Sequence, residues 1–265
     1  MSRDPIIIKT AGEIEIMRKA GAITAGARSV ARAAIADGLT TEQVNREVND
    51  FIIKSRAIPT FKGYGKHDGY DDGYPASTCI SVNEEVIHGI PGKRIIRNGD
   101  IVSVDVGATF GGFVGDCAGT YPCGEISEQA KKLIEVTRQS FFEGLKFARS
   151  GYRIDDIGSA IQDYAESHGF GVVRDFVGHG VGRNMHEAPE VPNYGIKGKR
   201  ANPRLVPGMT IAIEPMITAG GYGVHVLDND WTVVTNDGSL AAHYENTILI
   251  TDGEAEILTM AENID

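Results

Sequence analysis

Cysteine is scarce in this chain of 265 residues, with only Cys79, Cys117 and Cys123. An odd and sparse set of cysteines predicts no disulfide framework and favours a reducing compartment. The amino-terminal residues MSRDPIII lack an apolar stretch long enough for a signal peptide. No apolar run approaches the ~18 residues that a membrane-spanning helix needs. These absences lead us to expect a soluble, cytoplasmic protein with no membrane contact.

An excess of basic residues is also absent. Lys and Arg total 26 against 36 Asp and Glu, which gives a formal net charge of −10. Because nucleic-acid-binding proteins carry basic surfaces, we predict no direct nucleic-acid binding. The negative total does not exclude a metal site, since clustered carboxylates can hold cations. Hydrophobic residues make up 42% of the chain, enough for the core of one large domain or two small ones.

Helical and strand-like segments follow one another in two similar series. The apolar spacing of helices occurs at about 11–36, 41–54, 128–149 and 153–168. Thr41 and Ser127 are the expected N-caps of the second and third helices. Strand-like and loop residues fill most of the remaining chain, so we expect an α/β (α+β) protein.

The two series also match in detail. The matching pairs are GDIVSVD (99–105) with GMTIAIE (208–214), and GLTTEQVNREV (38–48) with GYRIDDIGSAI (151–161). The first pair leads from glycine through a β-rich run to a carboxylate, and the second leads from glycine into a helix. We expect a single domain over residues 1–265 with two similar halves, roughly 1–123 and 124–265. A cleft between them would bring their carboxylates face to face.

Two aspartates lie in an apparent β-hairpin, DIVSVDVGATFGGFVGDCAGTY. Strands are depleted in Asp, and a buried unpaired carboxylate is costly. A tight turn at the Gly-Gly pair would place Asp105 opposite Ala118, with Asp116 as its diagonal neighbour ~7–8 Å away. The two carboxylates could share a proton, meet an Arg or Lys, or bind a cation. For the pair alone, a structural or surface role is the alternative.

Further polar residues lie in similar contexts. Glu214 in TIAIEPM and Glu245 in HYENTILI each adjoin an apolar strand, although singly each is typical of a surface carboxylate at a strand end. The segment FVGHGVGRNMHEAPE contains His179 and His186. It lacks the Lys-Ser/Thr of a P-loop, and its histidines do not have the spacing of HExxH. One could be a ligand and the other an acid or hydrogen-bond donor. His88 in NEEVIHGIP lies in a turn, where active-site residues are common.

Five of these residues occur in the order D, D, H, E, E, namely Asp105, Asp116, His179, Glu214 and Glu245. Their contexts are VDV, GD, GHGVG, IEPM and YENT, and the chain also contains NEEVIHGIP, MHEAP and DNDWTVVTNDGSLAAHYE. The pattern covers nearly the whole chain and resembles the methionine aminopeptidases, specifically the bacterial type I enzymes. The resemblance implies the pita-bread fold, in which two pseudo-symmetric halves with antiparallel sheet and flanking helices surround a dinuclear metal site.

The resemblance also implies a role for each ligand. Asp105 would chelate one metal ion, His179 and Glu214 the other, and Asp116 and Glu245 would bridge both. Such an oxygen-rich set suits Mn, Fe or Co, with Zn as an alternative. Two metal ions can activate a bridging hydroxide as the nucleophile.

Substrate contacts follow from the same resemblance. His88 would contact the scissile amide, His186 would hydrogen-bond the developing oxyanion, and Glu214 would also shuttle a proton. The expected methionine pocket consists of Phe61, Tyr64, Tyr74, Cys79, Met185 and Trp231. Core packing is the alternative for Trp231, and a small buried hydrophobe the alternative for Cys79.

One segment departs from the family pattern. Residues 65–73, GKHDGYDDG, are longer than the corresponding link of the bacterial enzymes and border the expected pocket. One hypothesis is that Asp68, Asp71 and Asp72 form an acidic rim that attracts the cationic amino terminus of the substrate. A neutral surface insertion is the alternative.

On this resemblance the chain is expected to be a monomeric methionyl aminopeptidase. It would remove the initiator methionine from nascent proteins and peptides whose second residue is small, in functional association with the ribosome. The rivals are another pita-bread peptidase such as aminopeptidase P or prolidase, a metal-free creatinase-like hydrolase, and a non-enzymatic binding protein of the same fold. An additional amino-terminal domain would favour the first rival. The intact five-ligand set and both histidines argue against the other two.

Overall fold

The structure is a computed structural model that describes residues 5–66, 72–196 and 202–260. The described helices are α1 (Ala11–Ala34), α2 (Thr41–Lys54), α3 (Glu128–Leu145) and α4 (Ile154–Ser167). All four predicted helices are confirmed, and α1 and α3 end earlier than expected. Ile35 is extended and ends α1, whereas after α3 the chain continues in tight turns up to Ala148.

The predicted N-cap of α3 is confirmed, and that of α2 is wrong by one residue. Ser127 accepts a hydrogen bond from the Ala130 N–H at the start of α3. At the start of α2 the cap is Thr40, because its side chain and that of Gln43 each accept from the other's backbone N–H. This reciprocal pair is a capping box. The Thr41 hydroxyl instead donates to the carbonyl of residue 92.

Fifteen strands lie in the described part of the chain. They are β1 (Ile58–Pro59), β2 (Thr78–Val82), β3 (Glu85–Ile87), β4 (Ile101–Phe110), β5 (Phe113–Pro122), β6 (Gly171–Val172), β7 (Gly178–Gly180), β8 (Glu187–Val191), β9 (Thr210–Ile213), β10 (Met216–Thr218), β11 (Val224–Val226), β12 (Val233–Thr235), β13 (Ala241–His243), β14 (Glu245–Leu249) and β15 (Glu256–Ile257). Nine form a sheet with the order β1-β4-β5-β14-β9-β7-β8, in which β15 also pairs with β14 and β2 with β4. Two smaller sheets have the orders β13-β10-β6 and β11-β12-β3.

The hairpin of β4 and β5 has the predicted register. Phe110 pairs with Phe113 across Gly111 and Gly112, whose φ angles are 59° and 79°. A two-residue hairpin turn of type I′ has positive φ at both central residues, and glycine adopts positive φ without a steric penalty. Asp105 lies opposite Ala118, as expected.

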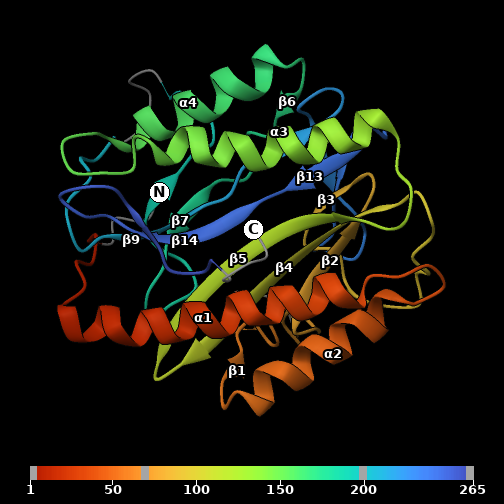
Figure 1. Ribbon diagram of the computed structural model, residues 1–265, viewed down its shortest axis with the longest axis horizontal. Coiled ribbons are helices and arrows are strands. Elements are labelled where there is room, and N and C mark those ends of the chain that lie inside the picture. The colour runs from red at the N-terminus through yellow and green to blue at the C-terminus, as the bar shows by residue number, and fades with distance from the viewer. Residues whose placement is uncertain (1–4, 67–71, 197–201, 261–265) are drawn as a thin grey trace.

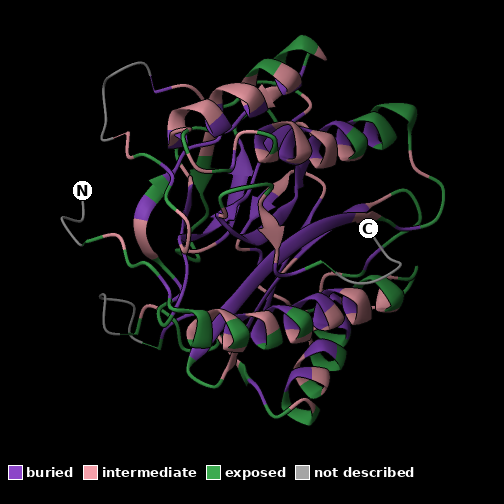
Figure 2. Cartoon of the chain, turned by 60° about the vertical axis from the view of Figure 1, so that its left-hand side comes forward, coloured by how far each residue is buried: buried purple, intermediate pink, exposed green. Residues whose placement is uncertain are grey.

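The helices lie in two layers on either side of the large sheet (Figure 1). α1 packs on β4 and β5, and α2 packs on α1, β1 and β2; Val102, Val104 and Val106 enter the core on this side. α3 and α4 pack on each other on the opposite side, over β9, β13 and β14. The strands between the layers are largely buried, whereas each helix also exposes polar residues (Figure 2). No helix within the described ranges is long and apolar enough to cross a membrane.

Candidate metal centre and active site

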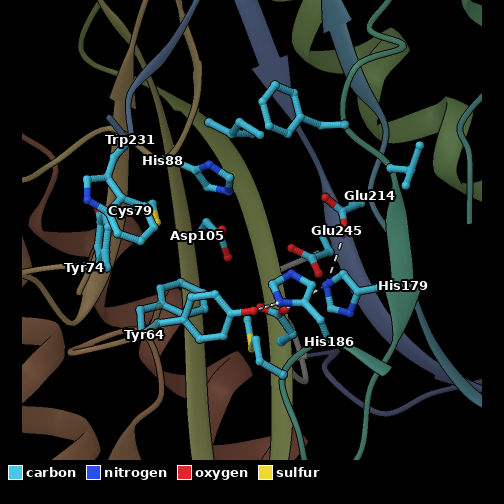
Figure 3. Close-up of a pocket in the computed structure, with 16 residues that line it drawn as sticks. Tyr64, Tyr74, Cys79, His88, Asp105, His179, His186, Glu214, Trp231 and Glu245 are labelled. Atoms are coloured by element: carbon cyan, nitrogen blue, oxygen red, sulfur yellow. Dashed lines mark hydrogen bonds and ion pairs between the residues drawn. The ribbon is translucent and has the colours of Figure 1, made fainter. Parts of the chain in front are cut away.

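Every site residue predicted from the sequence lines one cavity (Figure 3). These residues are Phe61, Tyr64, Tyr74, Cys79, His88, Asp105, Asp116, His179, Met185, His186, Glu214, Trp231 and Glu245. Three further lining residues, Ile87, Phe176 and Val177, were not predicted. All three lie beside histidines in motifs that were already recognised, NEEVIHGIP and FVGHGVGR. Their closeness in sequence to His88 and His179 is the feature from which they could have been predicted as lining residues.

The sheet order brings the four carboxylates together. β4, β5, β14 and β9 are consecutive neighbours. Asp105 pairs with Ala118, and Ala118 pairs on its other side with Glu245, so one row across three strands carries two carboxylates. Asn246 pairs with Ile213, which places Glu214 beside Glu245 at the end of β9. Segments far apart in sequence therefore converge.

Glycines on both sides of His179 allow β7 to pack closely against the neighbouring strands and bring His179 near the carboxylates. β7 lies between β8 and β9, and His179 has a glycine on each side. A Cβ at Gly178 would lie 2.4 Å from the Ala212 carbonyl oxygen, and one at Gly180 would lie 2.2 Å from the Ala188 carbonyl oxygen. Larger residues would push the strand away from its neighbours. The glycines of GHGVG thus serve close strand packing.

The ligating atoms form two groups that share Glu245. The oxygen and nitrogen atoms of Asp116, His179 and Glu245 lie within 4.8 Å of one another, and so do those of Asp105, His243 and Glu245. His179 Nδ1 donates to the Gly180 carbonyl oxygen at 2.9 Å. Its Nε2 therefore carries a lone pair, 3.6 Å from Asp116 Oδ2 and 3.5 Å from Glu214 Oε1. A histidine held in this way is preorganised for a metal ion.

Burial governs the charge of the carboxyl groups. It raises the pKa of Asp105, Glu214 and Glu245 well above their usual range, and neighbouring carboxylates raise these pKa values further. Burial raises the pKa of Asp116 to about 7. Desolvation and like charge both disfavour the ionised form. Without added positive charge, this cluster would retain protons at neutral pH.

Divalent cations fit this environment. Asp105 Oδ1, Asp116 Oδ1 and Glu245 Oε1 are buried and accept no hydrogen bond from the described residues. Among those residues, the ion-pair partners of Asp116, Glu214 and Glu245 are His179 and His243, not Lys or Arg. Carboxylate oxygens with one or two imidazoles are suitable donors for Mn, Fe, Co or Zn.

The other two predicted histidines, His88 and His186, are neutral, and their contacts differ from those of His179. Burial lowers the pKa of His88 to about 4, and the neighbouring His186 contributes. Burial likewise lowers the pKa of His186 to about 4. His88 has φ 58°, a left-handed conformation that is strained for a residue with a Cβ, and strain of this kind clusters at functional sites. The Tyr64 hydroxyl is hydrogen-bonded to His186 Nδ1.

The opposite end of the cavity is apolar (Figure 3). Tyr74, Cys79 and Trp231 lie there, and Trp231 packs edge-on against Tyr74 at 5.2 Å between ring centroids. Phe61 and Met185 are further buried residues of the lining. Burial raises the pKa of the Cys79 thiol well above its usual range, and the charge of Asp105 adds to this. A thiol with a raised pKa is a poor nucleophile, so Cys79 acts as a small apolar residue.

Residues 63, 64 and 74, which flank the unusual segment, are hydrogen-bonded to one another. The Gly63 N–H donates to the Tyr74 carbonyl oxygen at 2.7 Å, and the Tyr74 N–H donates to the Tyr64 carbonyl oxygen at 2.8 Å. These bonds hold both tyrosines beside each other despite the extra residues between them. Asp68 and Asp71 of the predicted acidic rim lie outside the described residues, and Asp72 is exposed.

The fold and the carboxylate–histidine cluster are those of a metal-dependent peptidase. The model of metallopeptidase family M24 matches residues 15–252, so the chain is a member of this family. Members of the family use divalent metal ions, as the buried cluster here would. The antiparallel sheets with flanking helices are the pita-bread fold expected from the sequence.

Within family M24 the chain belongs with the methionine aminopeptidases. It is 56% identical to the methionine aminopeptidase of Clostridium acetobutylicum over an alignment of 258 residues. That alignment covers 97% of this chain and 100% of the Clostridium protein. The crystal structure of methionine aminopeptidase from Thermotoga maritima superposes with a TM-score of 0.91 at 48% identity, over 97% of this chain and 100% of that one. Prolidase from Pyrococcus furiosus is less similar, with 25% identity, a TM-score of 0.76 and only 66% of its chain covered.

Proposed function

We propose that this protein is a dinuclear methionyl aminopeptidase that removes the initiator methionine from nascent proteins and peptides. The single observation that carries the proposal is the convergence of four carboxylates and His179 beside an apolar pocket. The high identity to methionine aminopeptidases over nearly the whole chain supports the same reaction. We further propose a monomeric cytoplasmic enzyme that acts on chains as they leave the ribosome and prefers a small second residue.

Five residues would hold the metal ions. Asp105 would chelate one ion, His179 and Glu214 the other, and Asp116 and Glu245 would bridge them. The membership of Glu245 in both groups of ligating atoms supports its bridging role. When bound, two such ions supply an activated hydroxide and polarise the scissile carbonyl. Mn, Fe or Co suits the donor set best, and Zn is the alternative.

The remaining polar side chains would position the substrate and move protons. Glu214, at the edge of the cluster, would accept a proton from the nucleophile and pass it on. His88 would contact the scissile amide and assist the leaving nitrogen. If the Tyr64 hydroxyl donates to His186 Nδ1, the neutral ring carries its proton on Nε2. That N–H would stabilise the carbonyl oxygen as negative charge develops on it.

The apolar end of the cavity would select methionine. A thioether side chain is flexible and polarisable, and it makes favourable contacts with aromatic rings. Phe61, Tyr74 and Trp231 offer such rings, and Cys79 and Met185 add soft apolar surface. Burial of a methionine side chain contributes roughly 1.5–3 kcal/mol. Leucine is branched and lacks sulfur, so it should fit this pocket less well.

The test compares two tripeptides and several metals. Metal-stripped protein is titrated separately with Mn, Co, Fe and Zn, and release of the first residue from Met-Ala-Ser and Leu-Ala-Ser is measured. Metal-dependent release of methionine, with little release of leucine, is the expected result. Glu245→Gln is the control, because it removes the shared ligand and should abolish cleavage under every metal. Wild-type protein that binds metal but cleaves neither peptide would overturn the proposed function.

A further inference from the structure

A third buried histidine, His243, lies directly beside the carboxylate cluster. It ends β13, two residues before Glu245, and is 2% exposed. Its Nε2 atom is 3.9 Å from Glu245 Oε2 and 4.0 Å from Glu214 Oε2. This nitrogen makes no hydrogen bond with the described residues. His243 is not among the residues that line the cavity, so it lies behind the two carboxylates and not beside the substrate.

The backbone of His243 is held firmly in this place. Its N–H donates to Thr120 Oγ1 at 2.9 Å, and the same hydroxyl donates to the His243 carbonyl oxygen at 2.9 Å. Ser103 Oγ is hydrogen-bonded to Thr120 Oγ1 at 2.7 Å, which anchors the contact to the β4–β5 hairpin. On its other side His243 pairs with Met216 of β10. The imidazole therefore approaches the cluster from a fixed direction.

The surroundings determine what Nε2 can do. A buried polar atom without a partner is costly, and here oxygens of the Glu245 and Glu214 carboxylates lie 3.9 and 4.0 Å away. Once bound cations keep both carboxylates ionised, a nitrogen lone pair between them would be repelled by both, whereas an N–H would be attracted by both. The present distances exceed those of a hydrogen bond, and a small rotation of either carboxylate would close the gap.

We propose that His243 is a positioning residue, whose Nε2–H holds the Glu214 and Glu245 carboxylates in their metal-binding orientation. The proposal rests on the metal-binding role of these carboxylates given above. Outer hydrogen bonds of this kind fix the direction of metal ligands. The alternative is direct ligation, because the ligating atoms of Asp105, His243 and Glu245 lie within 4.8 Å of one another. The position of His243 outside the cavity lining favours the hydrogen-bond donor.

Two substitutions separate these roles in the full-length protein. His243→Gln retains an N–H donor but replaces imidazole with a weak metal ligand, whereas His243→Leu removes the donor at similar volume. Mn(II) binding is measured by calorimetry, and His179→Gln is the benchmark for loss of a direct ligand. Loss of an outer hydrogen bond typically weakens metal affinity roughly 10- to 100-fold. We expect that loss for His243→Leu, near wild-type affinity for His243→Gln, and an unchanged number of bound ions for both.

The outcomes distinguish the two proposals. Equal loss of affinity in His243→Gln and His243→Leu would overturn the positioning role and indicate direct ligation. Unchanged affinity in His243→Leu would overturn any role for this side chain. Failure of the wild-type protein to bind metal would instead overturn the proposed function itself. A readout without substitution is the ¹⁵N spectrum of the Zn-loaded wild-type protein, in which His243 Nε2 should be protonated. A metal-bound or unprotonated Nε2 would refute the inference.

Discussion

Replacing Asp116 by Asn should abolish activity and yet stabilise the metal-free protein at neutral and alkaline pH. The residue is 2% exposed, and its side chain lies among three other carboxyl groups. Asn has nearly the same shape but no charge. The backbone N–H and C=O of residue 116 both bond to the Thr247 hydroxyl, and the substitution leaves those bonds unchanged. The effect on stability is therefore electrostatic.

The magnitude follows from the shift in pKa. Burial raises the pKa of Asp116 from 3.8 to about 7, so the folded metal-free protein holds this proton more tightly than the unfolded chain does. The stability contribution is complete below pH 4 and is lost as pH rises from about 4 to about 7. At about 1.4 kcal/mol for each pH unit, the ionised carboxylate costs about 4 kcal/mol above pH 7. Asn avoids that cost.

The assay is urea unfolding in the presence of a chelator, at intervals from pH 4 to pH 8.5. Burial lowers the pKa of His88, His179, His186 and His243, so their contribution to stability falls as pH decreases below about 6.5. The measured curve therefore combines opposite trends. The difference between wild type and Asp116→Asn reports the Asp116 carboxyl group together with its coulombic effect on Asp105, Glu214 and Glu245. Asp163→Asn, an exposed substitution of equal charge on α4, is the control.

We expect the two proteins to have similar stability near pH 4 and the Asn variant to gain about 4 kcal/mol by pH 8. Addition of Mn should reverse the order if Asp116 is the bridging ligand proposed above, because only the wild-type cluster would then hold the cation with its full set of ligands. An Asn variant that is less stable than wild type at pH 8 without metal would refute the reasoning. It would mean that the Asp116 carboxylate is stabilised by something other than a metal ion.

Three further substitutions test other parts of the structure. Tyr64→Phe removes the hydrogen bond to His186 and should lower kcat for Met-Ala-Ser about fivefold, which corresponds to about 1 kcal/mol, with little change in Mn affinity. Gly107→Ala places a Cβ 2.6 Å from Phe61 Cε1 and should raise KM for methionyl peptides roughly tenfold without changing metal binding. Arg28→Leu removes a buried cation that donates to backbone carbonyls of β5 and β14, and should lower the free energy of unfolding by about 3 kcal/mol. An unaltered kcat, KM or unfolding curve, respectively, would contradict each expectation.

Much of the site could be predicted because its charged residues lie within apolar, β-rich runs of the sequence. Aspartate within a β-rich run is costly unless a partner offsets it, so Asp105 and Asp116 are conspicuous in the sequence itself. The Gly-Gly turn then determines the hairpin register, and the observed pairing confirms it. The division into similar halves and the roles of individual ligands stay predictions.

Other features depend on contacts that the sequence does not display. His243 resembles an ordinary strand residue, and its importance depends on its distances to Glu245, which begins β14, and Glu214, which follows β9. Similarly, Thr40 and not Thr41 is the N-cap because the Thr40 hydroxyl accepts from the backbone N–H of residue 43, whereas the Thr41 hydroxyl donates to the carbonyl oxygen of residue 92. Helix ends differ from the predicted ones because tight turns and extended residues follow the last apolar position.

The strand order has a consequence for how this protein reaches its folded state. β14 is the second-to-last described strand of the chain, and it lies in the middle of the large sheet, between β5 and β9. Until it is inserted, both neighbours present unpaired edges, which are prone to association with other chains. Contacts between residues so distant in sequence also form slowly. A growing chain therefore cannot assemble the whole carboxylate–histidine cluster until Glu245 has been synthesised, and a fragment that ends before β14 should aggregate and should not retain a partial site.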